Sequence, residues 1–315
     1  DFTAHGSSKT PFALSAADAL TGATTLSVYG STSVAGWQVG DRLVVGKTED
    51  LSLESSEVST IAVISAGPAY SITLEGPLRY SHYALTPFPV ANIDRNVLIR
   101  SSSTDFTKAA YVRNLAENTT SFALAYAELS QLGQPAPGRY GLTFDGALTR
   151  GSVSSSTILD NAYGVYLVQA SSVSLTGNVV YRAGYHAVYA QNSSNIRYHG
   201  NVFVDTLNNV PALKLFSNGD VLTGNFALGN DCVGVRLQGD GALFDRNVFL
   251  ANGCVGLRIY GDANLVSSNT AIHNGWRGIN VNGDDNVVRG NFLFENSNTS
   301  LRVHGEGNLV SGNDV

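Results

Sequence analysis

A few residues in the middle of the chain could carry acid–base chemistry on a polysaccharide. Asp145 and Asp160 could form the carboxylate pair that glycosidases require. In a β-elimination, Asp145 or His186 could remove the proton next to a uronate carboxylate, while Arg139 or Lys214 neutralises that carboxylate. The alternative is structural, with Asp145 in a turn and His186 in the wall of the fold. The residues alone leave hydrolysis, elimination and a lack of catalysis open.

A second group of residues recurs at a nearly constant spacing and suits a linear polysaccharide. One column reads Tyr166, Tyr189, Lys214, Arg236, Arg258, Asn280 and Arg302. Two residues further on, another reads Val168, Gln191, Phe216, Gln238, Tyr260, Asn282 and His304. Aromatic faces can stack on sugar rings, and arginine pairs with carboxylates. We therefore predict that the substrate is bound by Tyr166, Tyr189, Lys214, Phe216, Arg236, Gln238, Arg258, Tyr260 and Arg302. The alternative is a solvated face whose charges discourage aggregation.

Metal and nucleotide chemistry has little support in the sequence. Asp240, Asp262, Asp284 and Glu306 each follow a glycine and form an acidic column. Ca²⁺ could bridge such carboxylates, but ordinary turn residues explain them as well. There is no zinc-ligand spacing, phosphate-binding loop or nucleophile elbow. We predict no metal ligand, and Ca²⁺ is the only cofactor left open.

These columns require an element that repeats about every 22 residues. Asparagine recurs at 178, 201, 225, 247, 269, 291 and 313, and two further asparagine columns accompany it, at 230 to 296 and at 264 to 308. Three turn columns per period imply three short strands per coil. Alternating segments such as 233–237 and 255–259 fit strands with one face inward. The pattern predicts an all-β, right-handed single-stranded parallel β-helix; a leucine-rich repeat, the competing architecture, lacks its leucine spacing here.

The repeat also explains two features without invoking function. An asparagine tolerates left-handed backbone, and its amide can bond to the next coil, so the asparagine columns are expected to satisfy turns. Cys232 and Cys254 are one period apart and so lie in adjacent coils. Either a disulfide or two stacked thiols fits this placement.

The composition limits the classes of molecule that the chain is expected to bind. The chain has 315 residues and a net charge of −6, with 14% charged residues. This charge argues against nucleic-acid binding, and no apolar run is long enough for a membrane span. The last segment, 313–315, stops within a rung without a visible cap. Open solenoid ends are adhesive, so self-association or a further domain is expected there.

The first 200 residues carry a series of motifs in a consistent order. They include Gly36-Trp37-Gln38-Val39-Gly40-Asp41, Glu57-Val58-Ser59-Thr60-Ile61, Pro77-Leu78-Arg79-Tyr80-Ser81-His82 and Asp94-Arg95-Asn96-Val97, followed by Leu132-Gly133-Gln134 and Gly138-Arg139-Tyr140. This series resembles the G8-domain family of the cell-migration-inducing hyaluronan-binding protein, the transmembrane protein 2 ectodomain and fibrocystin. The resemblance implies a G8-like β-rich cap at 1–95, a β-helix at 96–315, and a secreted or cell-surface protein that degrades or binds a uronic-acid glycan such as hyaluronan.

The chain departs from that family at a place that bears on catalysis. The family's Arg-Tyr-Pro-x-His-Phe-His segment corresponds to 139–145, where Thr143 and Asp145 replace both histidines. A later acidic pair is replaced by Gln191 and Asn192. A non-catalytic adhesin or structural surface module is therefore the alternative to an enzyme.

Overall fold

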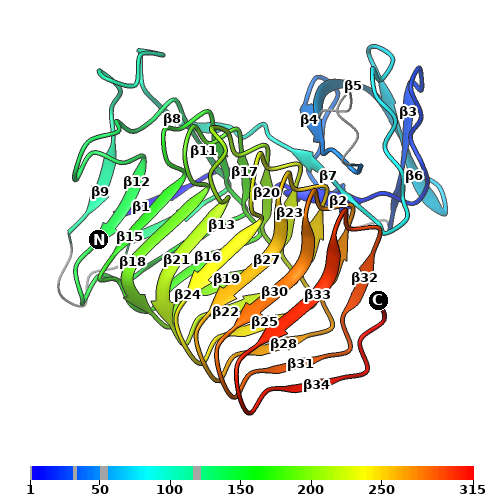
Figure 1. The fold of residues 1–315 in the computed structure, drawn as a ribbon. Helices are drawn as coiled ribbons and strands as arrows, with labels where there is room; N and C mark the ends of the chain where they lie inside the picture. Colours follow the sequence, from blue (N-terminus) through cyan, green and yellow to red (C-terminus); the bar gives the residue numbers. More distant parts are fainter. Residues whose placement is uncertain (1, 31–33, 50–55, 116–121) are drawn as a thin grey trace.

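The chain folds entirely into β-strands and turns, in a computed structural model that describes residues 2–30, 34–49, 56–115 and 122–315 (Figure 1). Three long parallel sheets run the length of the molecule, and each coil gives one strand to each sheet in turn. The chain is therefore a parallel β-helix, as the 22-residue period predicts. None of the described residues forms a helix that could cross a lipid bilayer.

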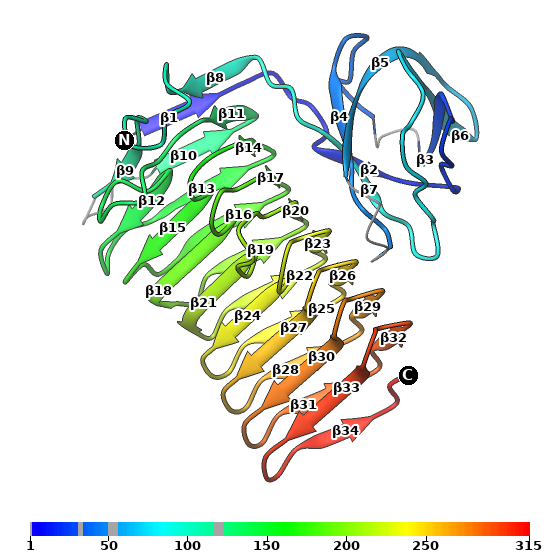
Figure 2. The ribbon, with the colours of Figure 1, turned by 45° about the horizontal axis from the view of Figure 1, so that its top comes forward.

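The strands of the three sheets follow one another from coil to coil (Figure 2). Sheet 1 contains β1 (Phe2–His5), β10 (Phe122–Ala125), β13 (Gly151–Ser154), β16 (Val173–Thr176), β19 (Arg197–His199), β22 (Val221–Thr223), β25 (Leu243–Asp245), β28 (Leu265–Ser267), β31 (Val287–Arg289) and β34 (Leu309–Ser311). Sheet 2 contains β8 (Val97–Arg100), β11 (Ala127–Ser130), β14 (Thr157–Leu159), β17 (Val179–Tyr181), β20 (Val202–Val204), β23 (Phe226–Leu228), β26 (Val248–Leu250), β29 (Thr270–Ile272) and β32 (Phe292–Phe294). Sheet 3 contains β9 (Val112–Asn114), β12 (Leu142–Asp145), β15 (Val165–Val168), β18 (Val188–Ser194), β21 (Leu213–Asn218), β24 (Val235–Gln238), β27 (Val255–Tyr260), β30 (Arg277–Asn282) and β33 (Thr299–His304).

The interior is a continuous apolar column. Tyr198, Leu222, Phe244, Val266 and Val288 stack one above another from sheet 1, each almost fully buried. Sheets 2 and 3 add their own inward-facing columns to the same cluster. Burial of this surface, worth about 25 cal/mol per Å² of apolar area, supplies the main driving force for stacking the coils.

The asparagine columns form buried hydrogen-bonded ladders at the turns. Asn247, for example, donates its amide to Leu222 O and Asn269 Oδ1, both at 2.9 Å. Its own Oδ1 accepts the backbone N–H and the side-chain amide of Asn225, at 3.0 and 2.9 Å. The same arrangement recurs from Asn178 to Asn313. The structural interpretation of these asparagines is confirmed, because each ladder satisfies turn groups that would otherwise be buried without partners.

The acidic column and the cysteines also lie where the period places them. In the exposed turns of the acidic column, the carboxylates of Asp240, Asp262 and Asp284 each accept the backbone N–H of the next member, at 2.7 to 2.8 Å. These residues therefore serve the turns. The sulfur atoms of Cys232 and Cys254 are 2.8 Å apart in adjacent coils and are not joined by a disulfide in the structure.

The N-terminal region forms a smaller antiparallel sheet, in the order β2 (Phe12–Leu14), β7 (Pro89–Asn92), β4 (Arg42–Val45), β5 (Glu57–Ser65), β6 (Ala69–Leu74) and β3 (Thr25–Tyr29). It is β-rich, as expected, but it does not cap the first coil. It lies beside the solenoid, and its apolar residues share one buried cluster with the outer face of sheet 2 (Figure 2).

The outer face of sheet 2 explains this side-on docking. Val179, Tyr181, Val202, Val204 and Phe226 point outward from sheet 2 and are buried by the smaller sheet. A parallel sheet that is apolar on both faces needs a cover on both, and the coil interior covers only one. The predicted cap position was wrong for this reason.

The start of the chain belongs to the solenoid. Strand β1 pairs in parallel with β10, with Phe2 opposite Phe122, so it forms the first strand of sheet 1. The chain then leaves to build the smaller sheet and returns at β8. The predicted N-terminal region of 1–95 thus contains a solenoid strand as well as the smaller sheet.

Candidate functional site

The outer face of sheet 3 carries the two columns predicted to bind a polysaccharide. Tyr166 lies opposite Tyr189, which lies opposite Lys214, and the register continues through Arg236 and Arg258. Asn280 and Arg302 complete this column, and the second column keeps the same register from Val168 to His304. Residues one coil apart therefore stand side by side as predicted, with strands about 4.8 Å apart.

Towards the N-terminal coils, this face is a cluster of aromatic rings. Tyr140 stacks on Tyr166 with ring centroids 3.8 Å apart, and Tyr166 stacks on Tyr189 at 4.7 Å. Tyr163 meets Tyr166 edge to face at 5.5 Å and stacks on Tyr185 at 5.1 Å. We refer to these five tyrosines as the tyrosine cluster. Tyr140, Tyr163 and Tyr185 were not assigned a role from the sequence, because they lie in connections between strands rather than in the strand columns.

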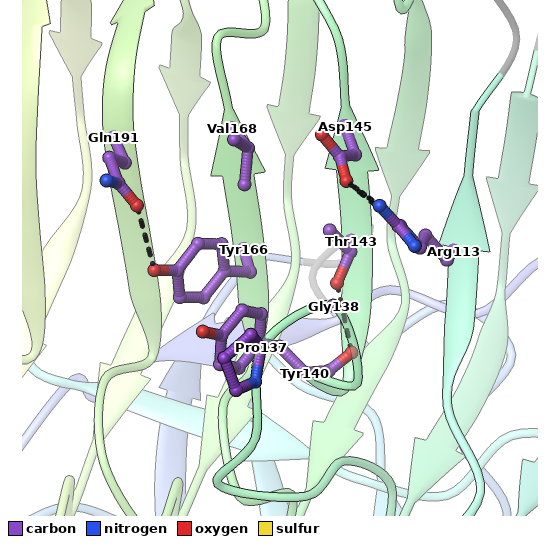
Figure 3. Close-up of a pocket in the computed structure, with 9 residues that line it drawn as sticks. All are labelled: Arg113, Pro137, Gly138, Tyr140, Thr143, Asp145, Tyr166, Val168 and Gln191. Atoms are coloured by element: carbon purple, nitrogen blue, oxygen red, sulfur yellow. Dashed lines mark hydrogen bonds and ion pairs between the residues drawn. The ribbon is translucent and has the colours of Figure 1, made fainter.

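A pocket lies next to the tyrosine cluster and contains Asp145 (Figure 3). Its lining is formed by Arg113, Pro137, Gly138, Tyr140, Thr143, Asp145, Tyr166, Val168 and Gln191. Arg113 forms a short ion pair with Asp145, with the Nε donating at 2.9 Å. Tyr166 donates its hydroxyl to Gln191 at 3.2 Å. Arg113 was missed from the sequence, because the coil that leads from β9 to β12 is longer than the 22-residue period.

The predicted catalytic residues are not assembled into one site. Asp145 ends β12 on sheet 3, whereas Asp160 follows β14 on sheet 2, where it pairs with Arg182 at 3.3 Å. The proposed Asp145–Asp160 acid–base pair is therefore wrong, since the two carboxylates project from different sheets. Arg139 donates to Gln134 at 3.3 Å and does not line the Asp145 pocket.

His186 lies in the wall between the tyrosine cluster and the next coil. Its Nδ1 is 2.6 Å from Pro211 O, and because a carbonyl only accepts, this nitrogen carries the proton. Burial lowers the pKa of His186 to about 4, so the ring is neutral near pH 7. Its ring centroid is 5.2 Å from that of Tyr189. His186 could accept a proton only through its second nitrogen.

Towards the C-terminal coils, the same face becomes cationic. The Lys214 ammonium lies 5.3 Å from the Tyr189 ring centroid and 5.4 Å from that of Phe216. Arg236 lies over Tyr260 at 5.4 Å. Such contacts hold a cation over an aromatic face and contribute about 0.5–1 kcal/mol each at exposed sites. Burial and the nearby charge of Arg236 lower the pKa of Lys214.

The basic column ends in a group centred on Trp276. Arg277 lies 3.8 Å and Arg258 5.5 Å from the centroid of the Trp276 ring. Arg302 donates to Asn282 at 2.8 Å. Trp276 and Arg277 were missed from the sequence, although both directly precede the alternating segment of β30. The candidate site as a whole is thus an aromatic half that grades into a cationic half. Within the described ranges, no group of three or more His, Cys, Asp or Glu side chains could hold a metal ion.

Comparisons with solved structures give matches at low identity. A variant of the periplasmic alginate epimerase AlgG aligns with 14% identity and a TM-score of 0.48 over 64% of this chain and 62% of its own. The mannuronan C-5 epimerase AlgE4 A-module of Azotobacter vinelandii gives 13% identity and a TM-score of 0.43 over 65% of this chain and 76% of its own. The Gp54 tailspike of Acinetobacter baumannii bacteriophage AP22, solved in complex with a capsular saccharide, gives 13% identity and a TM-score of 0.25 over 97% of this chain and 60% of its own.

The first of these matches spans less than two thirds of the epimerase chain. No curated protein sequence matches significantly. The family described as the right handed beta helix region, in contrast, matches residues 99–237 and 141–315, which together include all the coils from β9 onward. The chain therefore belongs to the right-handed β-helix family.

Proposed function

We propose that the outer face of sheet 3 binds a linear polysaccharide that contains uronic acid. The observation that supports this most is the unbroken register from Tyr166 to Arg302, which places aromatic and basic side chains in one stripe. Six strand steps of about 4.8 Å give this stripe a length of about 29 Å. A stripe of that shape suits an extended polymer better than a compact ligand.

Charge and ring chemistry favour an acidic sugar chain. Within the described part of the chain, Arg236, Arg258 and Arg302 have no ion pair with a carboxylate. Stacked like charges are unfavourable in the free protein, and an anionic ligand relieves that repulsion. The tyrosine cluster offers apolar ring faces to the apolar faces of sugars. The resemblance of the first 200 residues to the G8-domain family favours hyaluronan as the first polymer to test.

Binding is better supported than degradation. Among the residues that line the pocket, Asp145 is the single carboxylate, and it already forms an ion pair with Arg113. Hydrolysis through two carboxylates lacks its second group there. β-Elimination remains the second candidate, because Asp145, Arg113 and Tyr166 surround one pocket and could supply a base, a cation and a proton donor.

The test combines binding with product detection. The protein is incubated with hyaluronan, chondroitin, pectate and alginate, with and without Ca²⁺, and unsaturated uronates and new reducing ends are followed. Affinity is measured in parallel for Tyr189→Ala and for Tyr29→Ala, an exposed tyrosine of the smaller sheet. We expect Tyr189→Ala to lose about 1 kcal/mol of binding, or roughly fivefold in Kd, and Tyr29→Ala to bind normally.

Binding without new ends would support an adhesin or structural module over an enzyme. New unsaturated ends that the native chain produces and Asp145→Asn does not would support the elimination. Equal affinities of both tyrosine variants, or no binding to any of the polymers, would reject sheet 3 as the glycan-binding face.

A further inference from the structure

The group of arginines around Trp276 differs from the rest of the cationic half. Trp276 is 38% exposed, although Arg277 stacks on its ring at 3.8 Å and Arg258 lies 5.5 Å from the ring centroid. Arg277 occupies the position in β30 opposite Val255 of β27 and Thr299 of β33. The exposed ring of Trp276 and the two guanidinium groups beside it thus combine an aromatic face with positive charge on one surface.

The Nε donors of three arginines on this face are not used within the protein. The Nε atoms of Arg258 and Arg277 are buried and have no hydrogen-bond partner, and the same holds for Arg236 in the neighbouring coil. Among the described residues, none of the three has an ion pair with an acid. A buried donor without a partner is unfavourable, so an acceptor that reaches these guanidinium groups would relieve that cost.

The charges in this group also repel one another. Burial and the nearby charges of Arg302 and Arg258 lower the pKa of Arg277. Three like charges close together, with aromatic surface between them, favour an anion that can sit among them. The planar fork of a guanidinium matches a carboxylate with two parallel hydrogen bonds.

We propose that Trp276, Arg258, Arg277 and Arg302 form a subsite for the carboxylate of a uronate unit, with the sugar ring against the exposed part of Trp276. This inference rests on the proposed function and assigns the two halves of the face different sugars. The tyrosine cluster takes uncharged sugar surface, since the neighbouring His186 is neutral near pH 7. The Trp276 subsite takes the charge of the polymer and so fixes where along the face an acidic unit lies.

The fluorescence of Trp276 can report binding at this subsite. The sequence holds two tryptophans, and the other, Trp37, is buried in the N-terminal region between β3 and β4, with its Nε1 donating to Thr10 O at 2.8 Å. Tryptophan fluorescence of the full chain is titrated with oligosaccharides of hyaluronan, alginate and pectate. Each is also tested with its carboxyl groups reduced to alcohols, and a sulfated, carboxyl-reduced sample separates sulfate from carboxylate as the recognised anion.

We expect acidic oligosaccharides to change the fluorescence of the native chain but not of Trp276→Phe. Carboxyl reduction should weaken binding by about 10-fold, as expected for a lost charge-assisted pair. Arg277→Gln should weaken binding of the acidic form by about 10-fold and leave binding of the reduced form unchanged. The matched control is Arg246→Gln, which removes an exposed arginine beside Asp245 on sheet 1 and should alter neither affinity.

Two results would overturn the subsite and leave glycan binding on sheet 3 intact. One is equal affinity of the native chain for acidic and reduced forms, and the other is an equal loss for both forms in Arg277→Gln. Recovery of full affinity by the sulfated, reduced sample would also overturn the assignment to a carboxylate. If no oligosaccharide binds to the native chain by calorimetry or fluorescence, the proposed function fails together with the subsite.

Discussion

Replacing Asp220 by asparagine should stabilise the protein at neutral and alkaline pH. Asp220 follows β21 and is fully buried in the third asparagine column, two coils before Asn264. Its Oδ1 accepts the backbone N–H of Ile196 at 3.0 Å and the hydroxyl of Ser217 at 2.8 Å. At the equivalent position two coils later, the side-chain amide of Asn264 donates to Gly239 O. The Oδ2 of Asp220 replaces that amide and has no hydrogen-bond partner. Asparagine would supply the donor that Asn264, Asn286 and Asn308 provide at this position in later coils.

The size of the effect follows from the ionisation of Asp220. Burial raises the pKa of this carboxyl from 3.8 to about 7. Between these two values the folded protein holds a proton that the unfolded chain has lost, so stability falls as pH rises through this window and levels off above pH 7. At about 1.36 kcal/mol per pH unit, the total is about 4 kcal/mol, of which roughly 2–3 kcal/mol is lost between pH 5 and pH 8. Asp220→Asn carries no such charge and should avoid the loss.

Urea unfolding at pH 5 and pH 8, followed by circular dichroism, measures the difference between the native chain and Asp220→Asn. We expect the variant to be more stable by several kcal/mol at pH 8 and the advantage to shrink at pH 5. Asp262→Asn is the matched control, because this exposed carboxylate also accepts a backbone N–H from the next coil and asparagine keeps that acceptor. An advantage of Asp220→Asn that is absent at pH 8, or the same at both pH values, would refute the assignment of a buried protonated carboxyl.

Two further perturbations test the packing of the coils. Asn247→Ala removes four buried hydrogen bonds and should lower the free energy of unfolding by about 3–5 kcal/mol in urea titrations, whereas Asn298→Ala in an exposed turn should cost less than about 0.5 kcal/mol. Mild oxidation should join Cys232 and Cys254 within one chain, because they occupy the same position in adjacent coils. Thiol titration and mass spectrometry would detect this, and unchanged thiols or disulfide-linked dimers would contradict it.

The solenoid was predictable from the sequence because asparagines recur at the turns with the period of the coils. Each coil must place an asparagine at the same corner, so the positions of Asn225, Asn247 and Asn269 fix the register of every strand between them. The aromatic and basic columns of sheet 3 follow from that register alone. The pairing of Asp145 with Asp160 was not based on this register, and the 22-residue step from β14 to β17 places Asp160 beside sheet 2 rather than sheet 3.

The docking of the smaller sheet could have been anticipated but was not. The runs after each asparagine, such as Val202-Phe203-Val204, are apolar at three consecutive positions, which marks strands buried on both faces. Arg113 and Tyr140 had no such signal. They reach the Asp145 pocket from the first coils and from a long connection, and sequence spacing does not determine where such segments lie.

The smaller sheet changes how the solenoid can come apart. A stack of coils in which each coil contacts only its neighbours can unravel from an end, one coil at a time. Here a single insertion, tethered at both of its ends within the first coil, lies across strands from β14 to β29. It also bonds to distant coils, with Ser56 donating to Asp205 at 2.6 Å and His273 Nδ1 lying 3.0 Å from Thr48 O. This insertion makes the fraying of one coil depend on the others, so the coils are expected to unfold together rather than one at a time.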